Sequence, residues 1–438
     1  MRKNIYLSMA FAILPWLAAT AQTPLRATLG ELFKLAEVQN SDIGAAKNTI
    51  HVAEQQEKVT STSQLPQIKA SLILAYIGNG KIIDRNFSNP VRDKLPHFSN
   101  TLDLEVFQPL YSGGAISGSI ALSGKQTEMT RLGLDATRNA IRMSIVRNFL
   151  ELAKNRNLLA VYDENIRLTE KLLDKMKVKH SQGVALKNNI TRYELKLSSL
   201  NYDRLAIRNA IRICNANLTS ILNLDPATEL LPEASAAPLL PFANPDTWME
   251  SALANSSQIK SYGLQSDMEQ LGKKITHAAY LPQIGLAGGN HFLGPITFEV
   301  PVLDKNYNAW SVGLQVNWNI SSLFTTGKAT RKHDLELTRI RAEQKTTEKA
   351  IGRQIHEALT LYRQAIERLD VERKNIQLAE ENYAVISSRF DNQLVLLTDM
   401  LDASTARLDA GVRLVNAEIS AQYYYYQLHF ITGTLITL

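Results

Sequence analysis

Few of the reactive side chains in this sequence stand at a spacing that catalysis or metal binding requires. The segment TTGKAT, residues 325–330, resembles the end of a phosphate-binding loop, but such a loop needs a glycine where the chain has Ser322. The eight histidines are scattered and form no HxxxH pair. No GxSxG segment occurs, and Cys214, the one cysteine, has no base pattern beside it. We therefore expect no catalytic residues, no cofactor, no bound metal and no enzymatic activity.

The first residues of the chain have the order of a secretory signal peptide. Arg2 and Lys3 precede an apolar stretch at residues 5–17, and residues 19–21, ATA, form a small-residue cleavage site. We assign residues 1–21 to the signal. Beyond it, no apolar run reaches the roughly 20 residues of a membrane-spanning helix. The exported chain is therefore expected to be periplasmic, secreted or inserted in an outer membrane through β-strands. The net formal charge of +6 is too mild to indicate a nucleic-acid partner.

The same landmarks recur in both halves of the chain. LPQI occurs at residues 65–68 and again at 281–284, an offset of 216. The segment that starts at Leu168 aligns with the one that starts at Leu378, an offset of 210. Similar offsets at several landmarks indicate a duplicated architecture. The expected parts are a first repeat at 22–225, a Pro- and Ala-rich linker at 226–245 and a second repeat at 246–438.

Long segments without proline predict long helices in each repeat. The longest, near residues 115–180 and 327–391, would each span about 100 Å at the rise of an α-helix, which implies coiled-coil packing. Apolar residues recur mostly at steps of three and four between Leu186 and Leu218 and between Leu397 and Ile419, which predicts nearly straight helices. The other expected helices are near 41–64, 185–222, 256–279 and 395–432. The long and shorter helices would form duplicated hairpins.

Two segments in each repeat predict β-strands, near residues 67–80, 98–110, 283–293 and 309–321. In the second strand of each repeat, apolar residues alternate with polar ones, which is the period of a strand with one apolar face. Leu72, Leu74 and Tyr76 continue this pattern in the first segment, whereas GLAGGNHF, residues 285–292, is Gly-rich and ambiguous. The apolar positions, expected to face lipid, are Leu102, Leu104, Val106, Leu314, Val316 and Trp318. The polar positions, expected to face a water-filled lumen, are Asp103, Glu105, Gln315 and Asn317. Carboxylates would be costly inside a sandwich core, so the alternation favours a membrane barrel. Four strands cannot close one, so we expect an oligomer.

Together these features resemble the TolC family of outer-membrane efflux proteins over essentially the whole mature chain. The resemblance lies in LPQI after each first helix, FQPLYSGGAISG at the first long helix, GVALKNNITRYE at the first far turn and LLTDMLDASTARLDA at the second. It implies an α+β fold that is mostly helical, in which long hairpins form a periplasmic coiled-coil tunnel and three protomers share a twelve-strand transmembrane β-barrel. It also implies an exit duct in outer-membrane lipid that extends into the periplasm. Its partners would be a periplasmic adaptor protein and an inner-membrane transporter.

The resemblance also assigns roles to residues near the two far turns. Asp399 and Asp402 match aspartates that narrow the periplasmic entrance in the family, and Asn189 and Phe390 stand at associated positions of this gate. The family more often has an acidic residue in place of Asn189 and a tyrosine in place of Phe390. The expected adaptor-docking residues are Gly183, Val184, Ala185, Leu394, Val395 and Leu396. An alternative interpretation of the aspartates is an ordinary helix start, where the macrodipole favours acidic side chains.

The alternative function is a coiled-coil structural rod or adhesin, secreted or held at the cell surface, without transport activity. Such a rod would not need two amphipathic hairpins at matched places in two repeats. A periplasmic adaptor is a further alternative, but adaptors usually combine one helical hairpin with small β-domains. The duplicated layout therefore favours a homotrimeric exit duct, a passive conduit for drug efflux or for type I protein secretion.

Overall fold

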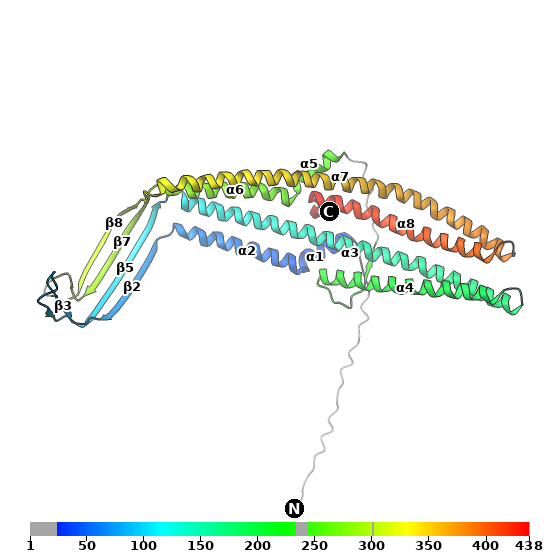
Figure 1. Cartoon of the computed structure of the whole chain (residues 1–438), viewed down its shortest axis with the longest axis horizontal. Helices are drawn as coiled ribbons and strands as arrows, with labels where there is room; N and C mark the ends of the chain where they lie inside the picture. Colours follow the sequence, from blue (N-terminus) through cyan, green and yellow to red (C-terminus); the bar gives the residue numbers. More distant parts are fainter. Residues whose placement is uncertain (1–23, 234–243, 300–301, 438) are drawn as a thin grey trace, which may run out of the picture. The chain divides into compact units, whose positions relative to one another are not determined.

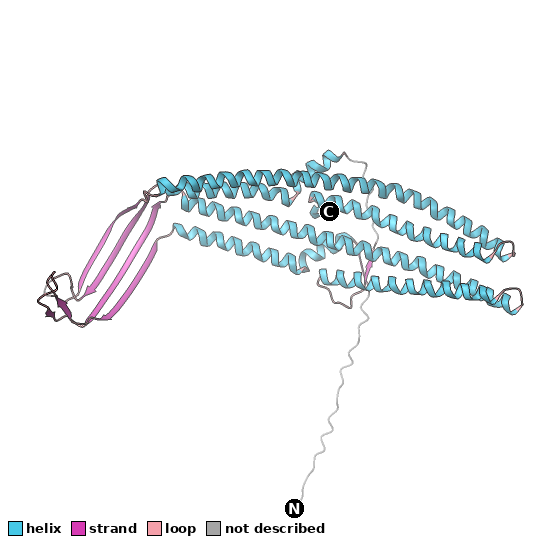
Figure 2. Cartoon of the chain, in the orientation of Figure 1, coloured by secondary structure: helices cyan, strands magenta, loops and turns pink. Residues whose placement is uncertain are grey.

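The computed structural model describes residues 24–233, 244–299 and 302–437, which divide into two compact units (Figure 1, Figure 2). The sheet unit contains the described residues of 41–143, 239–364 and 424–437, and the hairpin unit contains those of 24–40, 144–238 and 365–423. Two long helices, α3 (Ala115–Ser181) and α7 (Ser322–Asp391), contribute to both units. The expected signal peptide and the central part of the expected linker lie outside the described residues.

Each repeat enters the sheet through a helix that stops before a proline. Helices α2 (Ser41–Ser61) and α6 (Ser257–His277) are both 21 residues long, and a short 3-10 turn follows each of them. Pro66 and Pro282 come next, and each lacks the N–H that a continuing helix would need. The strands β2 (Gln67–Tyr76) and β7 (Gln283–Gly294) begin one residue later. LPQI is therefore the junction between helix and strand in both repeats.

The sheet consists of four antiparallel strands in the order β2-β5-β7-β8 (Figure 1). The second strand of each repeat is β5 (Phe98–Tyr111) or β8 (Tyr307–Asn317). The central pair, β5 with β7, joins the two repeats and places Leu104 opposite Asn290. The register shifts between Pro109 and Tyr111, because proline has no N–H to donate to the ladder. In the part of the chain that the structure describes, β2 and β8 are edge strands with a partner on one side only.

Several short elements lie outside the pattern that the sequence analysis identified. Helix α1 (Leu29–Gln39) begins with a capping box, in which Thr28 and Glu31 satisfy each other's backbone N–H groups. Helix α5 (Pro245–Asn255) starts with a proline after the Asn244 cap. Two small sheets are also present, a parallel pair of β1 (Leu25–Ala27) with β6 (Leu230–Pro232) and an antiparallel pair of β3 (Gly80–Ile82) with β4 (Val91–Asp93). Part of the expected linker is thus the ordered strand β6.

In the hairpin unit, α4 (Lys187–Ile221) packs on the later part of α3, and α8 (Leu397–Thr432) packs on the later part of α7. The contacts follow the expected apolar stripes, so that Leu200 and Leu408 are buried. Arg204 interrupts the first stripe, and its Nε lies 2.6 Å from Asp163 Oδ1 on α3, so an interhelical ion pair accounts for the polar position. The expected fold class, a mostly helical α+β fold with duplicated long hairpins, is confirmed.

None of the helices in the described ranges is both long enough and apolar enough to cross a membrane.

Candidate functional site

The pairing register separates the sheet into one apolar and one polar face, because residues opposite each other on antiparallel strands point to the same side. One such row is Ile68, Val106, Gly288 and Val312. The apolar residues of this face include Ile68, Leu72, Leu74, Leu102, Leu104, Val106, Ile284, Leu286, Phe292, Val312, Leu314 and Val316, and the same rows also contain Asn100, Asn290 and Asn308. It brings together the expected lipid-facing residues of β5 and β8. Trp318 comes just after β8, and its indole N–H donates to the carbonyl of Tyr280 at 3.1 Å.

The polar face carries the residues that were expected to face water. Asp103 lies opposite His291, and Asp103 Oδ1 is 2.8 Å from His291 Nδ1. Glu105 lies opposite Lys69 on β2. Other polar side chains of this face include Ser71, Ser99, Thr101, Ser311, Gln315 and Asn317. Two strands from each repeat thus contribute acidic, basic and neutral polar side chains to this face, which also contains Ile73, Phe107 and Leu293.

Neither face of the sheet is covered by other described parts of the protomer. Leu72 is 63% exposed and Leu314 is 71% exposed, although both lie in the middle of an apolar surface. A soluble monomer rarely exposes a contiguous apolar surface of this kind, and such surfaces usually mark contact with lipid or with another protein. The sheet therefore lacks the environment that its apolar face requires.

Aromatic residues stand at both ends of the apolar face. At one end Tyr76 pairs with Phe98, and the Tyr76 ring stacks on His97 with a centroid separation of 5.0 Å. At the other end are Tyr111 and Trp318. The strand from Phe98 to Tyr111 is about 43 Å long at the rise of a β-strand. With the usual tilt of barrel strands this is enough to cross an apolar band of about 25 Å and to place aromatic girdles at its borders.

The sequence analysis missed one large aromatic on the apolar face. Trp310 lies opposite Asn290 and is exposed. It belongs to the same alternating series as Val312, Leu314 and Val316, so extending the period by two more steps would have found it.

The two far turns have the same backbone geometry in both repeats. Gly183 has φ 77° after α3, and the N–H of Val184 bonds to the carbonyl of Lys179. Gln393 has φ 62° after α7, and the N–H of Leu394 bonds to the carbonyl of Arg389. A left-handed residue followed by a bond back across the last turn is a common way to end a helix. Positions 210 apart are therefore structurally equivalent at these turns.

The six expected docking residues differ in their surroundings. Leu394 is 73% exposed, and Val184 and Leu396 are exposed as well. Ala185 and Val395 instead pack against a buried apolar cluster, and Gly183 supplies the left-handed conformation of the turn. Leu186, which the sequence analysis did not single out, is exposed at the position equivalent to Leu396. Each turn thus presents two outward apolar side chains.

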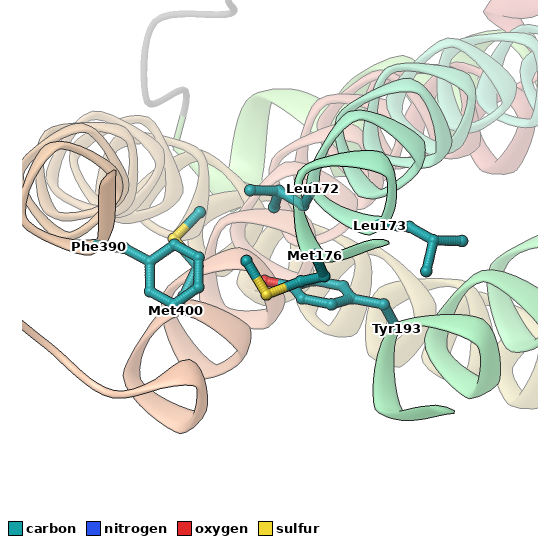
Figure 3. Close-up of a cluster of buried hydrophobic side chains, with 6 residues drawn as sticks. All are labelled: Leu172, Leu173, Met176, Tyr193, Phe390 and Met400. Carbon is teal, nitrogen blue, oxygen red and sulfur yellow. The ribbon is translucent and has the colours of Figure 1, made fainter. Parts of the chain in front are cut away.

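Phe390 lies in that buried cluster (Figure 3). The cluster consists of Leu172, Leu173, Met176, Tyr193, Phe390 and Met400, drawn from all four helices of the hairpin unit. Phe390 is 8% exposed, and the Lys179 ammonium lies 5.3 Å from the centre of its ring. Burial raises the pKa of the Tyr193 hydroxyl, so this group stays neutral at physiological pH. Phe390 therefore positions the turns by packing.

Asp399 and Asp402 lie together on one exposed face at the start of α8, because residues three apart on a helix are neighbours. The Oδ2 atom of Asp399 accepts the N–H of Leu396 at 2.9 Å, so this carboxylate also caps the helix. Asn189 occupies the equivalent position in the first repeat and is half-buried on α4. The next equivalent pair, Arg192 and Asp402, has opposite charges. The structure thus groups the two aspartates on the exposed side of α8, whereas Phe390 is buried.

Residues 248–434 match the family model described as outer membrane efflux protein. This match covers most of the second repeat, which therefore resembles that family in sequence. No curated protein sequence matches the chain significantly.

Solved outer-membrane channels share the fold of the whole chain. VceC from Vibrio cholerae is 14% identical, with a TM-score of 0.76 over 92% of this chain and 96% of that one. The CmeC channel of Campylobacter jejuni is 15% identical, with a TM-score of 0.76 over 99% and 94%. The open MtrE channel of Neisseria gonorrhoeae is 14% identical, with a TM-score of 0.71 over 93% and 89%. The resemblance to the TolC family is thereby confirmed.

Proposed function

We propose that the chain is the outer-membrane exit duct of a tripartite efflux or type I secretion system. It lies in the outer membrane, extends into the periplasm and passively conducts small molecules or proteins rather than catalysing a reaction. The observation that carries the proposal is the sheet, whose apolar face ends in aromatic residues while its other face is polar. Lipid on one side and water on the other satisfy both faces at once.

Three copies complete the membrane-spanning part. One protomer supplies four strands and leaves β2 and β8 as open edges, and unpaired edges cannot exist in hydrocarbon. Pairing the β8 edge of one copy with the β2 edge of the next closes a barrel of twelve strands. In that barrel Leu102, Leu104, Val106, Leu314, Val316 and Trp318 face lipid, and Asp103, Glu105, Gln315 and Asn317 face the lumen.

The helices offer matching surfaces for the same association. On α4, Leu195 and Tyr202 are exposed seven residues apart, and on α7, Val371, Leu378 and Val385 are exposed with the same spacing. Tyr202 stands 18 residues from Val184 of its turn, and Leu378 stands 16 residues from Leu394 of the other turn. Two such stripes at similar distances from the turns suit side-by-side packing of α4 against α7 of a neighbouring copy.

The oligomer is the first test of this function. We expect the full chain to fractionate with the outer membrane and to run as a trimer on unheated gels and as a monomer after heating. A Leu378→Glu substitution buries a carboxylate in the proposed contact and should reduce the trimer band severely. Ala384→Glu adds the same charge on an exposed site away from the stripe and is the control. A soluble monomer in the unaltered protein would exclude the duct and favour the secreted rod.

The exposed apolar residues of the far turns are the proposed adaptor site. Val184, Leu186, Leu394 and Leu396 are apolar residues at the helix ends and are largely exposed. A helical hairpin of a periplasmic adaptor would cover them, and the inner-membrane transporter would join through the adaptor. Ala185, Val395 and Gly183 hold these side chains in place.

The aspartates form the proposed periplasmic gate. In a trimer, three copies of Asp399 and Asp402 lie around the axis and make a ring of carboxylates that favours cations over anions. Phe390 contributes by fixing the turn from within the cluster, and Asn189 adds no charge to the ring. Asp402 would contribute only its charge to the gate, whereas Asp399 also caps α8.

We expect the trimer to be a cation-selective channel that trivalent cations block from the periplasmic side. The double substitution Asp399→Asn and Asp402→Asn keeps an acceptor for the Leu396 N–H but removes the ring's charge, and it should raise the half-blocking concentration by about tenfold or more. The measurement is single-channel current in a planar bilayer with the cation added to each side in turn. Asn189→Ala is the uncharged control and should change block little. If the double variant is blocked as strongly as the parent, the two aspartates are ordinary helix-start residues.

A further inference from the structure

A tight turn between β3 and β4 presents an aromatic side chain outward. The N–H of Phe87 bonds to the carbonyl of Asp84 at 2.8 Å, and the N–H of Asp84 bonds back to the carbonyl of Ser88 at 3.1 Å. The Asn89 amide donates to Asp84 Oδ2 at 2.8 Å, and Asn86 Oδ1 accepts the Ser88 N–H. These hydrogen bonds order the turn and fix the direction of the side chain at position 87.

Phe87 is an unfavourable residue for this place. Its φ is 61°, in the left-handed region that glycine or asparagine occupies easily and a bulky residue does not. Its side chain is 90% exposed, so no packing inside the described protomer compensates for the strain. Strain of this kind at an exposed aromatic points to a contact outside the protomer.

The surroundings of Phe87 indicate the chemistry of that contact. Ile82, Ile83 and Val91 are also exposed apolar residues of this segment. The exposed cations are Lys81, Arg85, Arg92 and Lys94, and none of them has an ion-pair partner in the described ranges. Only Asp84 and Asp93 oppose them, and Asp84 is used in the turn. The segment thus combines apolar side chains with an excess of positive charge, which suits an anionic lipid surface.

The position of the segment leads to the same partner. Residues 81–94, here named the Phe87 segment, connect the ends of β2 and β5 beyond Tyr76 and Phe98. These two aromatics close one end of the apolar face, and aromatic girdles lie at the level of the lipid headgroups. We propose that the Phe87 segment docks on the anionic headgroup surface of the surrounding bilayer, with Phe87 inserted at the border of the apolar layer. This inference rests on the proposed function, because it requires β2 and β5 to cross a membrane.

The test uses the full-length trimer with Cys214→Ser, which removes the one native cysteine, and Phe87→Cys labelled with an environment-sensitive fluorophore. The protein is reconstituted in vesicles of phosphatidylcholine, with or without phosphatidylglycerol, that contain lipids spin-labelled near the headgroup. In anionic vesicles we expect the spin label to reduce the fluorescence about twofold or more. Adding Arg85→Gln and Arg92→Gln should bring this quenching down to the level of neutral vesicles, because the substitutions remove charge and leave the label in place.

The possible results separate the inference from the function on which it rests. Absence of quenching in trimers that insert and conduct would overturn the lipid contact while leaving the duct intact. If the quenching is the same with and without phosphatidylglycerol, and with and without the two arginine substitutions, the proposal that the segment binds anionic headgroups is wrong. Shielding of the label from iodide in detergent-solubilised trimers would mean that a neighbouring copy covers position 87. If the protein does not insert into the vesicles, both the proposed duct and the proposed lipid contact are wrong.

Discussion

A Leu104→Arg variant is expected to lose nearly all trimer from the outer membrane, whereas Asp103→Arg should retain most of it. Leu104 sits on the apolar face between Ala70 of β2 and Asn290 of β7, away from both aromatic ends. A lipid-facing arginine near the middle of the bilayer costs about 2–4 kcal/mol, and each trimer would contain three of them. Asp103 is one residue away on the polar face, where an arginine would remain in water. The measurement is the heat-sensitive trimer band in the outer-membrane fraction.

The comparison is informative because the two positions share a strand and receive the same side chain. Asp103→Arg does remove the contact with His291, so a modest loss of stability is expected there too. Leu104→Ala serves as a second control, since it shortens the side chain without placing a charge in lipid. Equal damage from both arginines would mean that the faces of β5 are assigned the wrong way round or that neither faces lipid.

The second large effect is expected at the far turns. Val184→Asp combined with Leu394→Asp should abolish efflux while trimer assembly and single-channel conductance stay unchanged. Both side chains are exposed, so their removal takes little from the packing of the hairpin unit. An adaptor that covers them with apolar residues would instead have to bury two unpaired carboxylates per protomer. Efflux is measured as drug accumulation in cells that lack their own duct and express a compatible pump.

Asn188→Asp is a matched control for this pair of substitutions. It adds a carboxylate at an exposed position at the start of α4 but removes no apolar side chain. Leu396 is a poorer choice for an aspartate, because its N–H is already bound by Asp399 and a second carboxylate would disturb the cap. Normal drug efflux in the double variant would remove the turns from the docking surface.

Helix ends and the faces of the strands could be predicted from the sequence, because local patterns determine them. Proline at positions 66 and 282 ends two helices, and alternation along β5 and β8 reports which side chains share a face. These signals depend on backbone chemistry and on the period of the strand, so they need no knowledge of distant parts of the chain. Whether a residue has an odd or even position in its strand was therefore enough to predict which face of the sheet it occupies.

Other features were missed for different physical reasons. The capping box at Thr28 and Glu31 was present in the sequence and could have identified α1. Phe390 follows Tyr383 and Ile386 at steps of seven and four, which places it on the same inward side of α7. In contrast, β1 and β6 are three residues long and pair across about half the chain, so no local pattern specifies them. Short parallel pairing of this kind depends on the folded arrangement of the helices around it.

The opposite charges at Arg192 and Asp402 have a consequence for the symmetry of the assembly. Three protomers with two hairpins each would present six turns of nearly identical backbone, all with a pair of outward apolar residues. A partner that contacts only those apolar residues would find six equivalent binding sites. A partner that also makes electrostatic contacts would distinguish three basic turns from the three acidic turns that alternate with them. Duplication followed by divergence of the charges near the turns would thus give the duct two classes of binding site, which could bind either three or six adaptors.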